Sequence, residues 1–204
     1  MSKRILLGIG IILLFNIAYA GNPNFYLGAG LTFANSAIEF KSGDNVETDF
    51  IRLVSFYGGT EFPLDNLNKY AITFEASYRQ MGSEITFRDP VMTEVGVLKN
   101  SYFCLSPALR ARLTRGYYSF YVKGGVFLGS LIKAKMEETA VTDQFKNMDF
   151  GGDACLGVEI LASQLAKLFI EIRYSHSLTD ANAEMDIFNK INNRTICIQT
   201  GVKF

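Results

Sequence analysis

The sequence predicts an all-β fold: an eight-stranded antiparallel transmembrane β-barrel of up-and-down topology that follows a cleaved signal peptide. Three observations predict it, namely an export signal, strands that alternate apolar and polar residues, and connections that alternate long and short. The clearest strand lies in residues 167–180. Its apolar residues occupy every second position: Leu168, Ile170, Ile172 and Tyr174. Glu171 and Arg173 lie between them, so one face is apolar and the other is charged.

The first twenty residues have the features of a secretory signal peptide. Lys3 and Arg4 precede an uncharged apolar run at 5–15, and Ala18-Tyr19-Ala20 has the small-x-small form that signal peptidase cleaves. A membrane anchor is the alternative, but the run is too short to cross about 30 Å of hydrocarbon comfortably. We therefore expect residues 1–20 to be removed and residues 21–204 to form one β-barrel domain.

The composition excludes several classes of protein. Acidic and basic residues number 20 each, so no basic excess favours a nucleic-acid partner. No later segment reaches eighteen consecutive apolar residues, which argues against a helical membrane span. Trp is absent, whereas 17 Phe and 10 Tyr suit strands. Since no Cys-x-x-Cys motif or His cluster is present, we expect neither a metal nor another cofactor.

Eight segments show the strand pattern, with short connections after the second, fourth and sixth. They cover about residues 25–40, 50–62, 69–83, 97–113, 117–132, 148–161, 167–176 and 195–204. The apolar face, which we expect to contact lipid, carries no charge through the central span of any strand. The opposite face carries eleven charged residues: Glu61, Glu75, Arg79, Arg110, Arg112, Lys123, Asp153, Glu159, Glu171, Arg173 and Lys203.

These inward positions comprise five acids and six bases, which is close to neutral. A charge in a narrow, poorly solvated interior is costly unless it is paired, so near balance predicts a salt-bridged network. Eight strands leave just enough interior space for side chains, so we expect a filled lumen. Water threading between the charged pairs, as in a small pore, is the alternative. A secreted lipocalin-like barrel would need the inverse pattern, with an apolar interior and a polar exterior.

Three cysteines in an exported chain form an odd number, which argues against a disulfide framework. Cys104, Cys155 and Cys197 fall on the inner faces of the fourth, sixth and eighth predicted strands. Second-neighbour strands lie roughly 9–10 Å apart, beyond the roughly 7 Å limit for a disulfide. We expect three buried free thiols. Pro107 cannot donate to a ladder, so a β-bulge is expected there, which could shift the faces of half its strand.

Several stretches resemble a known family. Residues 68–82, NKYAITFEASYRQMG, are similar to the turn and E-x-x-Y-x-x-x-G strand of the porin-like outer membrane protein beta-barrel domain family. Ser106-Pro107-Ala108-Leu109 resembles its fourth strand, and residues 120–125 and 169–175 resemble its fifth and seventh. His176 departs from the family, which often has Gly there. The resemblance implies an outer-membrane location, and it implies that Phe204 is the C-terminal signal read by the assembly machinery.

His176 is the only histidine, so a Ser/His hydrolase acting on outer-membrane lipids is one hypothesis. Ser175 and Ser177 would project to the opposite face of the strand, however, and a rim residue at the membrane surface is the simpler interpretation. Asp153 and Glu159 could suggest acid–base chemistry. Six residues apart on one strand, they would be separated by roughly 20 Å, which favours ion-pair partners instead.

Any recognition is expected in the long loops at 82–96, 133–147 and 177–194, because binding residues concentrate on loops. Residues 180–189 could form a short amphipathic helix or a strand extension. We expect an integral outer-membrane protein, not an enzyme, with a structural or interaction role. Its expected partners are outer-membrane lipids, the assembly machinery and a loop ligand that the sequence does not identify. A small porin or transport component, or a lipid-acting hydrolase, are the alternatives.

Overall fold

The computed structural model describes residues 23–40, 46–88, 93–137, 139–163, 165–183 and 188–204. The expected signal peptide, residues 1–20, lies outside them. The elements are β1 (Asn24–Phe40), β2 (Val46–Asp49), β3 (Ile51–Pro63), β4 (Tyr70–Arg88), β5 (Thr93–Arg112), β6 (Tyr118–Met136), β7 (Thr139–Ala140), the short 3-10 helix η1 (Thr142–Gln144), β8 (Met148–Leu161), β9 (Lys167–Ser177) and β10 (Phe188–Lys203). In the described chain, no helix is long and apolar enough to span a membrane.

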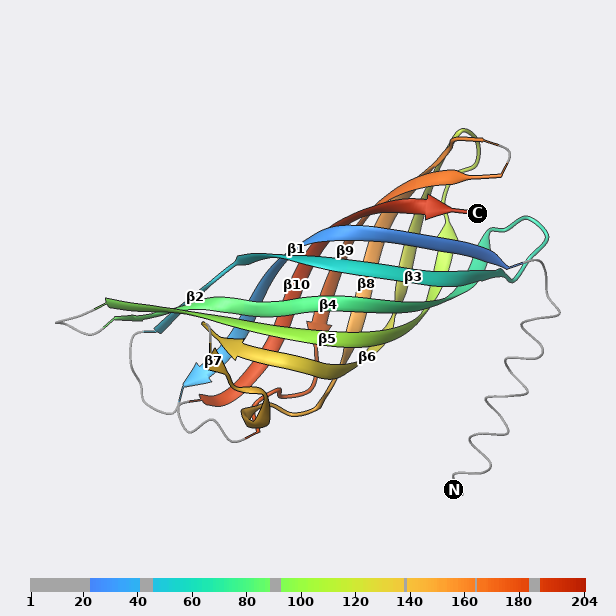
Figure 1. Ribbon diagram of the computed structural model, residues 1–204. Coiled ribbons are helices and arrows are strands. Elements are labelled where there is room, and N and C mark those ends of the chain that lie inside the picture. Colours follow the sequence, from blue (N-terminus) through green and yellow to red (C-terminus); the bar gives the residue numbers. More distant parts are fainter. Residues whose placement is uncertain (1–22, 41–45, 89–92, 138, 164, 184–187) are drawn as a thin grey trace, which may run out of the picture.

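The strands close into an eight-stranded antiparallel barrel, as the sequence predicts (Figure 1). Each strand pairs with its neighbour along the chain, and β1 pairs with β10, which completes the ring. β2 and β3 together form one wall strand, since both pair with β4 on either side of Phe50. β7 is a short addition to β6. Closure removes the free strand edges that would otherwise invite aggregation.

The short connections, the first described residues of β1 and the C-terminus gather at one end of the barrel, which we call the short-turn end (Figure 1). The three turns follow β3, β5 and β8. In the first, the Asp65 carboxylate accepts hydrogen bonds from the N–H groups of Lys69 and Tyr70, at 2.7 and 3.1 Å. Phe25 and Phe204 exchange two backbone hydrogen bonds of 3.1 and 2.8 Å, which join the first strand to the last. The longer connections lie at the opposite, long-loop end.

The predicted faces of the strands are confirmed. Outward apolar side chains are widely exposed: Leu27 is 60 % exposed, Leu109 is 62 % and Leu168 is 47 %. Inward side chains alternate with them and are buried, among them Glu75 and Arg173. An exterior of exposed Phe, Leu, Ile and Val around a charged interior is the arrangement of a barrel in lipid, and the inverse of a soluble barrel.

Near the long-loop end the polarity of the two faces inverts. On β5, Leu98 is fully buried and Lys99 is exposed; on β10, Ile191 is fully buried and Lys190 is exposed. The inward residues here form an apolar cluster that includes loop side chains. We call it the cap; its buried members are Ile85, Leu98, Ala134, Phe145, Ala181, Phe188 and Ile191. Polar residues outside and apolar residues inside suit a wall that is surrounded by water. The barrel therefore extends beyond the belt of outward apolar residues at this end.

One expected loop, 82–96, is largely strand, and the other two contain strand residues, which corrects the sequence interpretation. Residues 82–96 were expected to connect two strands, but β4 continues to Arg88 and β5 begins at Thr93. The expected 133–147 loop contains the end of β6, β7 and η1. The expected 177–194 loop loses its last residues to β10, which begins at Phe188; residues 184–187 lie outside the described chain. The inverted polarity explains the difference, because a search for outward apolar residues does not find these extensions.

The bulge expected at Pro107 is wrong. Leu105 pairs with Leu128 and Ala108 with Gly125, so the register between β5 and β6 is the same on both sides of the proline. The two ladder pairs between them are absent, as expected where Pro lacks an N–H, while Pro107 still pairs with Phe74 of β4. The strand therefore keeps its faces throughout.

The register shift lies elsewhere. Ser101 pairs with Lys133 and Tyr102 with Leu131, which leaves Ile132 as an extra residue in β6. A second shift lies between Glu39 and Phe40 of β1. Both lie toward the long-loop end, where the faces change polarity, and a bulge is one way to re-aim side chains there.

Candidate functional site

The charged lumen is the candidate site, and it is built from side chains of seven of the eight wall strands. All eleven residues singled out in the sequence point into it. β3 supplies Glu61, β4 Glu75 and Arg79, β5 Arg110 and Arg112, β6 Lys123, β8 Asp153 and Glu159, β9 Glu171 and Arg173, and β10 Lys203. Alternate positions of these strands face inward, so the parity of each strand sets which charges enter the lumen. The pairs between them arrange the charges in three layers along the barrel.

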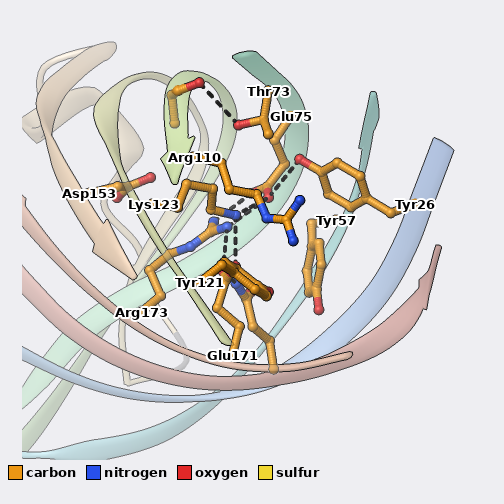
Figure 2. Close-up of polar contacts among 12 residues, drawn as sticks. Tyr26, Tyr57, Thr73, Glu75, Arg110, Tyr121, Lys123, Asp153, Glu171 and Arg173 are labelled. Atoms are coloured by element: carbon orange, nitrogen blue, oxygen red, sulfur yellow. Dashed lines mark hydrogen bonds and ion pairs between the residues drawn. The ribbon is translucent and has the colours of Figure 1, made fainter. Parts of the chain in front are cut away.

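The central layer consists of Glu75, Lys123, Glu171 and Arg173 (Figure 2). Arg173 binds both Glu75 oxygens, at 2.5 and 2.7 Å, and lies 3.2 Å from Glu171. Lys123 completes the ring, with its Nζ 2.9 Å from Glu171 and 3.8 Å from Glu75. Two carboxylates therefore face two cations from three wall strands, and the layer is neutral. A bidentate guanidinium–carboxylate pair is the strongest ion-pair geometry available to side chains.

Tyrosines and a glutamine satisfy the remaining oxygens of the central layer. The Tyr121 hydroxyl donates to Glu171 at 3.1 Å, and the Tyr26 hydroxyl donates to Glu75 at 3.4 Å. The Gln199 side-chain amide also donates to Glu171. These donors come from β1, β6 and β10, so the layer touches the barrel wall nearly all the way round. Such additional hydrogen bonds are what a buried ion pair needs to offset its desolvation.

Arg79 and Asp153 form the second layer, toward the long-loop end. The two Arg79 terminal nitrogens donate to the two Asp153 oxygens at 3.1 and 2.8 Å. The same guanidinium donates to Ser106 at 2.8 Å and to Ser77 at 3.0 Å. It also lies 3.5 Å from Glu75, which links this layer to the central one.

The third layer lies at the short-turn end. Arg110 lies 2.7 Å from Glu61 and 2.8 Å from Glu159, and Lys203 lies 2.5 and 2.8 Å from the same two carboxylates. Arg112 is more loosely placed, 3.6 Å from Glu159. Lys167, which the sequence analysis did not single out, also reaches Glu159, at 3.8 Å from a half-exposed position.

Glycines make room for the large inward rings. A Cβ on Gly157 would lie 2.3 Å from the Tyr121 ring, and one on Gly28 would lie 2.4 Å from the Tyr57 hydroxyl. The rings therefore lie flat across the glycines of the neighbouring strands. This packing fills the space between the charged layers, since Tyr26, Tyr57 and Phe169 form one apolar cluster there.

Three water-sized cavities lie in the lumen among the described residues. One cavity of about 20 Å³ is lined by residues of the central and third layers, including Lys123, Glu171 and Lys203. Two others of about 10 Å³ each adjoin Arg173, one beside Ser55 and Cys197 and one beside Asp153. About 10–15 Å³ holds one water molecule, so these cavities accommodate single waters rather than a ligand.

A further buried carboxylate, Asp149, escaped the sequence interpretation. It is 1 % exposed and accepts hydrogen bonds from Ser177 at 2.6 Å, Thr179 at 2.7 Å and Asn193 at 3.1 Å. Among the described residues it has no cation partner. Asp149 shares the inward parity of Gly151 and Asp153 on β8 and lies within the predicted strand at 148–161, so counting inward positions from the start of that strand would have found it.

The three cysteines lie where expected, buried and free on β5, β8 and β10. Asp153 and Glu159 both point inward but belong to different layers, each with its own cations. His176 points outward on β9, whereas Ser175 and Ser177 are buried on the inner face. The structure therefore brings neither serine toward the imidazole.

Comparisons with known proteins agree with this architecture. The family model described as the outer membrane protein beta-barrel domain matches residues 2–182. Among solved structures, the outer membrane protein OprG from Pseudomonas aeruginosa is similar with a TM-score of 0.54 and 12% identity, over 89% of this chain and 95% of that one. Neisserial surface protein A is similar with a TM-score of 0.53 and 14% identity, over 90% and 98%. The search of curated proteins finds no match.

At such low identities the solved structures establish the shared fold alone, whereas the family model covers most of the chain. Both agree with an outer-membrane β-barrel fold. The protein belongs to the outer membrane protein beta-barrel domain family and resides in the Gram-negative outer membrane.

Proposed function

We propose that this protein is a closed, non-conducting barrel with a structural or interaction role, and that it presents its long-loop end to partners outside the cell. The observation that carries the proposal is the neutral central layer, in which Arg173, Glu75, Lys123 and Glu171 pair across the lumen. In this family of barrels the short turns face the periplasm and the longer connections face outward.

The charged layers favour a plug over a pore. A conducting path through the central layer would require Arg173 to leave Glu75 or Lys123 to leave Glu171. Separating one buried ion pair costs about 3–5 kcal/mol, which keeps such an opening rare. The cap then closes the long-loop end with apolar side chains such as Leu98, Phe188 and Ile191. An ion crossing the barrel would have to pass both the apolar cap and the charged layers.

We also propose that the protein is not an enzyme. His176 has no serine or threonine hydroxyl among its hydrogen-bond partners in the described chain, and its neighbours Ser175 and Ser177 face the lumen. Acyl transfer by a Ser/His pair requires a hydroxyl within hydrogen-bond reach of the imidazole. A lipid-acting hydrolase would therefore need a rearrangement of β9.

Single-channel recording in planar bilayers tests the proposal. The wild-type barrel is expected to give no discrete conductance. A variant with Glu75, Lys123, Glu171 and Arg173 all replaced by alanine serves as the matched hollowed barrel, and its folding is checked by the shift in SDS-gel mobility on boiling. Steady wild-type conductance that the hollowed variant merely increases would favour the small-porin alternative and overturn the proposal.

A further inference from the structure

A row of polar side chains crosses the outer surface of four neighbouring strands near the long-loop end. His176 of β9 lies directly opposite Arg194 of β10, and Arg194 lies directly opposite Asn35 of β1. Directly opposed residues have Cβ atoms about 4.5–5.5 Å apart, so these three side chains are neighbours. Arg52 of β3 also points outward, and it lies one outward position closer to the short-turn end, opposite Phe33 of β1.

This row lies at the boundary of the apolar belt. The next outward residues toward the short-turn end are Tyr174, Ile196 and Phe33, all on the lipid-facing side. The Tyr174 ring stacks on the His176 ring, with centroids 6.4 Å apart and planes 6° from parallel. Tyrosine gathers at membrane–water interfaces, which places the row at the level of lipid headgroups. Because it is on the long-loop side, those headgroups belong to the extracellular leaflet.

The cations of the row differ from those of the lumen in having no partner. Each inward Arg and Lys of the charged layers forms an ion pair. In contrast, the side chains of Arg194 and Arg52 form no hydrogen bond or ion pair with any described residue. His176 Nδ1, which can donate to an anion when it carries the ring proton, is a buried atom without a hydrogen-bond partner. A polar atom shielded from water without a partner costs free energy, so a ligand that supplies one would be stabilised.

The acids near the row form no ion pair with its cations among the described residues. Glu39 of β1 points outward four residues beyond Asn35, but it lies opposite Lys190 of β10. Asp49 ends β2, where it lies opposite Glu84 of β4. The row itself contains two guanidinium groups, an imidazole and an amide, and no acid. Its net charge is positive.

We propose that Arg194, His176, Asn35 and Arg52 form a binding site for the two phosphate groups on the headgroup of an extracellular-leaflet glycolipid, the phosphorylated diglucosamine of lipid A. Arginine binds phosphate oxygens through paired N–H donors, and the amide and imidazole add further donors. The apolar belt below the row receives the acyl chains of the same lipid. One molecule thereby contacts both surfaces, which a free anion does not.

Native mass spectrometry of the refolded full-length barrel tests the site, with bisphosphorylated lipid A as the probe. The wild type is expected to bind it, and Arg194→Gln is expected to weaken binding at least about fivefold through loss of a charge-assisted contact. Arg115→Gln is the matched control, since Arg115 is an exposed cation in a turn at the short-turn end. Its binding should equal that of the wild type.

Two further probes identify the ligand group. Lipid A stripped of both phosphates should bind the wild type about as weakly as Arg194→Gln binds the intact lipid. Inorganic phosphate at millimolar concentration should not displace lipid A. Equal binding by wild type and Arg194→Gln, or displacement by free phosphate, would overturn the proposal. If Arg194→Gln does not fold, as judged by mobility on boiling, Arg194→Lys combined with His176→Gln replaces it, and unchanged lipid binding by that variant would be equally decisive.

Discussion

Replacing Arg173 with methionine is expected to destabilise the barrel more than any single change at its surface. Arg173 contributes one of the two cations of the central layer and is the bidentate partner of Glu75. Methionine has a similar length and no charge, so the substitution leaves Glu75 and Glu171 with Lys123 as their only cation within that layer. The layer then carries one uncompensated negative charge in a buried site.

The size of the effect follows from the geometry. Two unit charges about 4 Å apart interact by about 4 kcal/mol at an effective dielectric constant of about 20. Measured losses for removing one partner of a buried pair are about 3–5 kcal/mol, since the other charge stays buried. Tyr26 and Arg79 still contact Glu75, which places the expected loss toward the lower end of that range. The double variant Arg173→Met/Glu75→Gln restores neutrality and should recover most of the loss.

Urea titration of the barrel refolded in lipid vesicles measures both quantities, with the unboiled SDS-gel mobility reporting the folded fraction. Lys146→Gln is the matched control, because Lys146 pairs with Asp180 at 3.3 Å in an exposed position, where such pairs contribute about 0–1 kcal/mol. The reasoning fails if Arg173→Met and the double variant are equally unstable. Packing, and not charge balance, would then explain the loss.

Four other outcomes follow from the structure. Gly157→Ala should cost about 1–3 kcal/mol in the same titration, because the new methyl group meets the Tyr121 ring, while Gly124→Ala, which meets nothing within 4 Å, should cost less than about 0.5 kcal/mol. Ile191→Ala should remove about 2–5 kcal/mol by leaving a cavity in the cap, again read by urea titration. The three cysteines should resist a membrane-impermeant maleimide until the barrel is unfolded, as mass spectrometry of the labelled chain would show. Partial burial favours a higher pKa for Asp180, but hydrogen bonds from two backbone N–H groups and from Lys146 outweigh it, so the pKa lies below its usual value. The Asp180 carboxylate therefore stabilises the loop above about pH 4, and this stabilisation is lost as the pH falls through the folded-state pKa. Acid should increase proteolysis near residue 180 in the wild type. It should change proteolysis little in Asp180→Asn.

Most of the fold could be predicted from the period of two alone. On β9, the alternation of Leu168, Glu171, Ile172 and Arg173 fixes which side chains face lipid and which face the lumen. Because a slip of one residue would put charges into the membrane, the register of such a strand is strongly specified. The same logic placed the eleven lumen charges on the inner face without any knowledge of the neighbouring strands.

Which charges pair could not be predicted, because strand parity carries no information about depth or about the opposite wall. Arg79 and Asp153 belong to β4 and β8, and only the stagger of the closed barrel brings their side chains together. Pro107 shows a different limit. Its missing N–H suggested a bulge, yet the ladder simply loses two pairs and keeps its register, since the pairing with β4 holds the strand straight.

The strand extensions beyond the apolar belt could be recognised in the sequence from a change in which face of the strand is apolar. Below the row of His176 and Arg194, outward residues are apolar; above it, Lys99 and Lys190 point outward while Leu98 and Ile191 point inward. On β5 the alternation continues unbroken and only its sign changes, because the solvent outside the wall changes from lipid to water, whereas β6 and β10 each also carry an extra residue at this level. Reading each strand for the point at which the sign inverts therefore locates the membrane boundary and the cap together. It also explains why unpaired cations gather at that level, where lipid phosphates are the nearest anions.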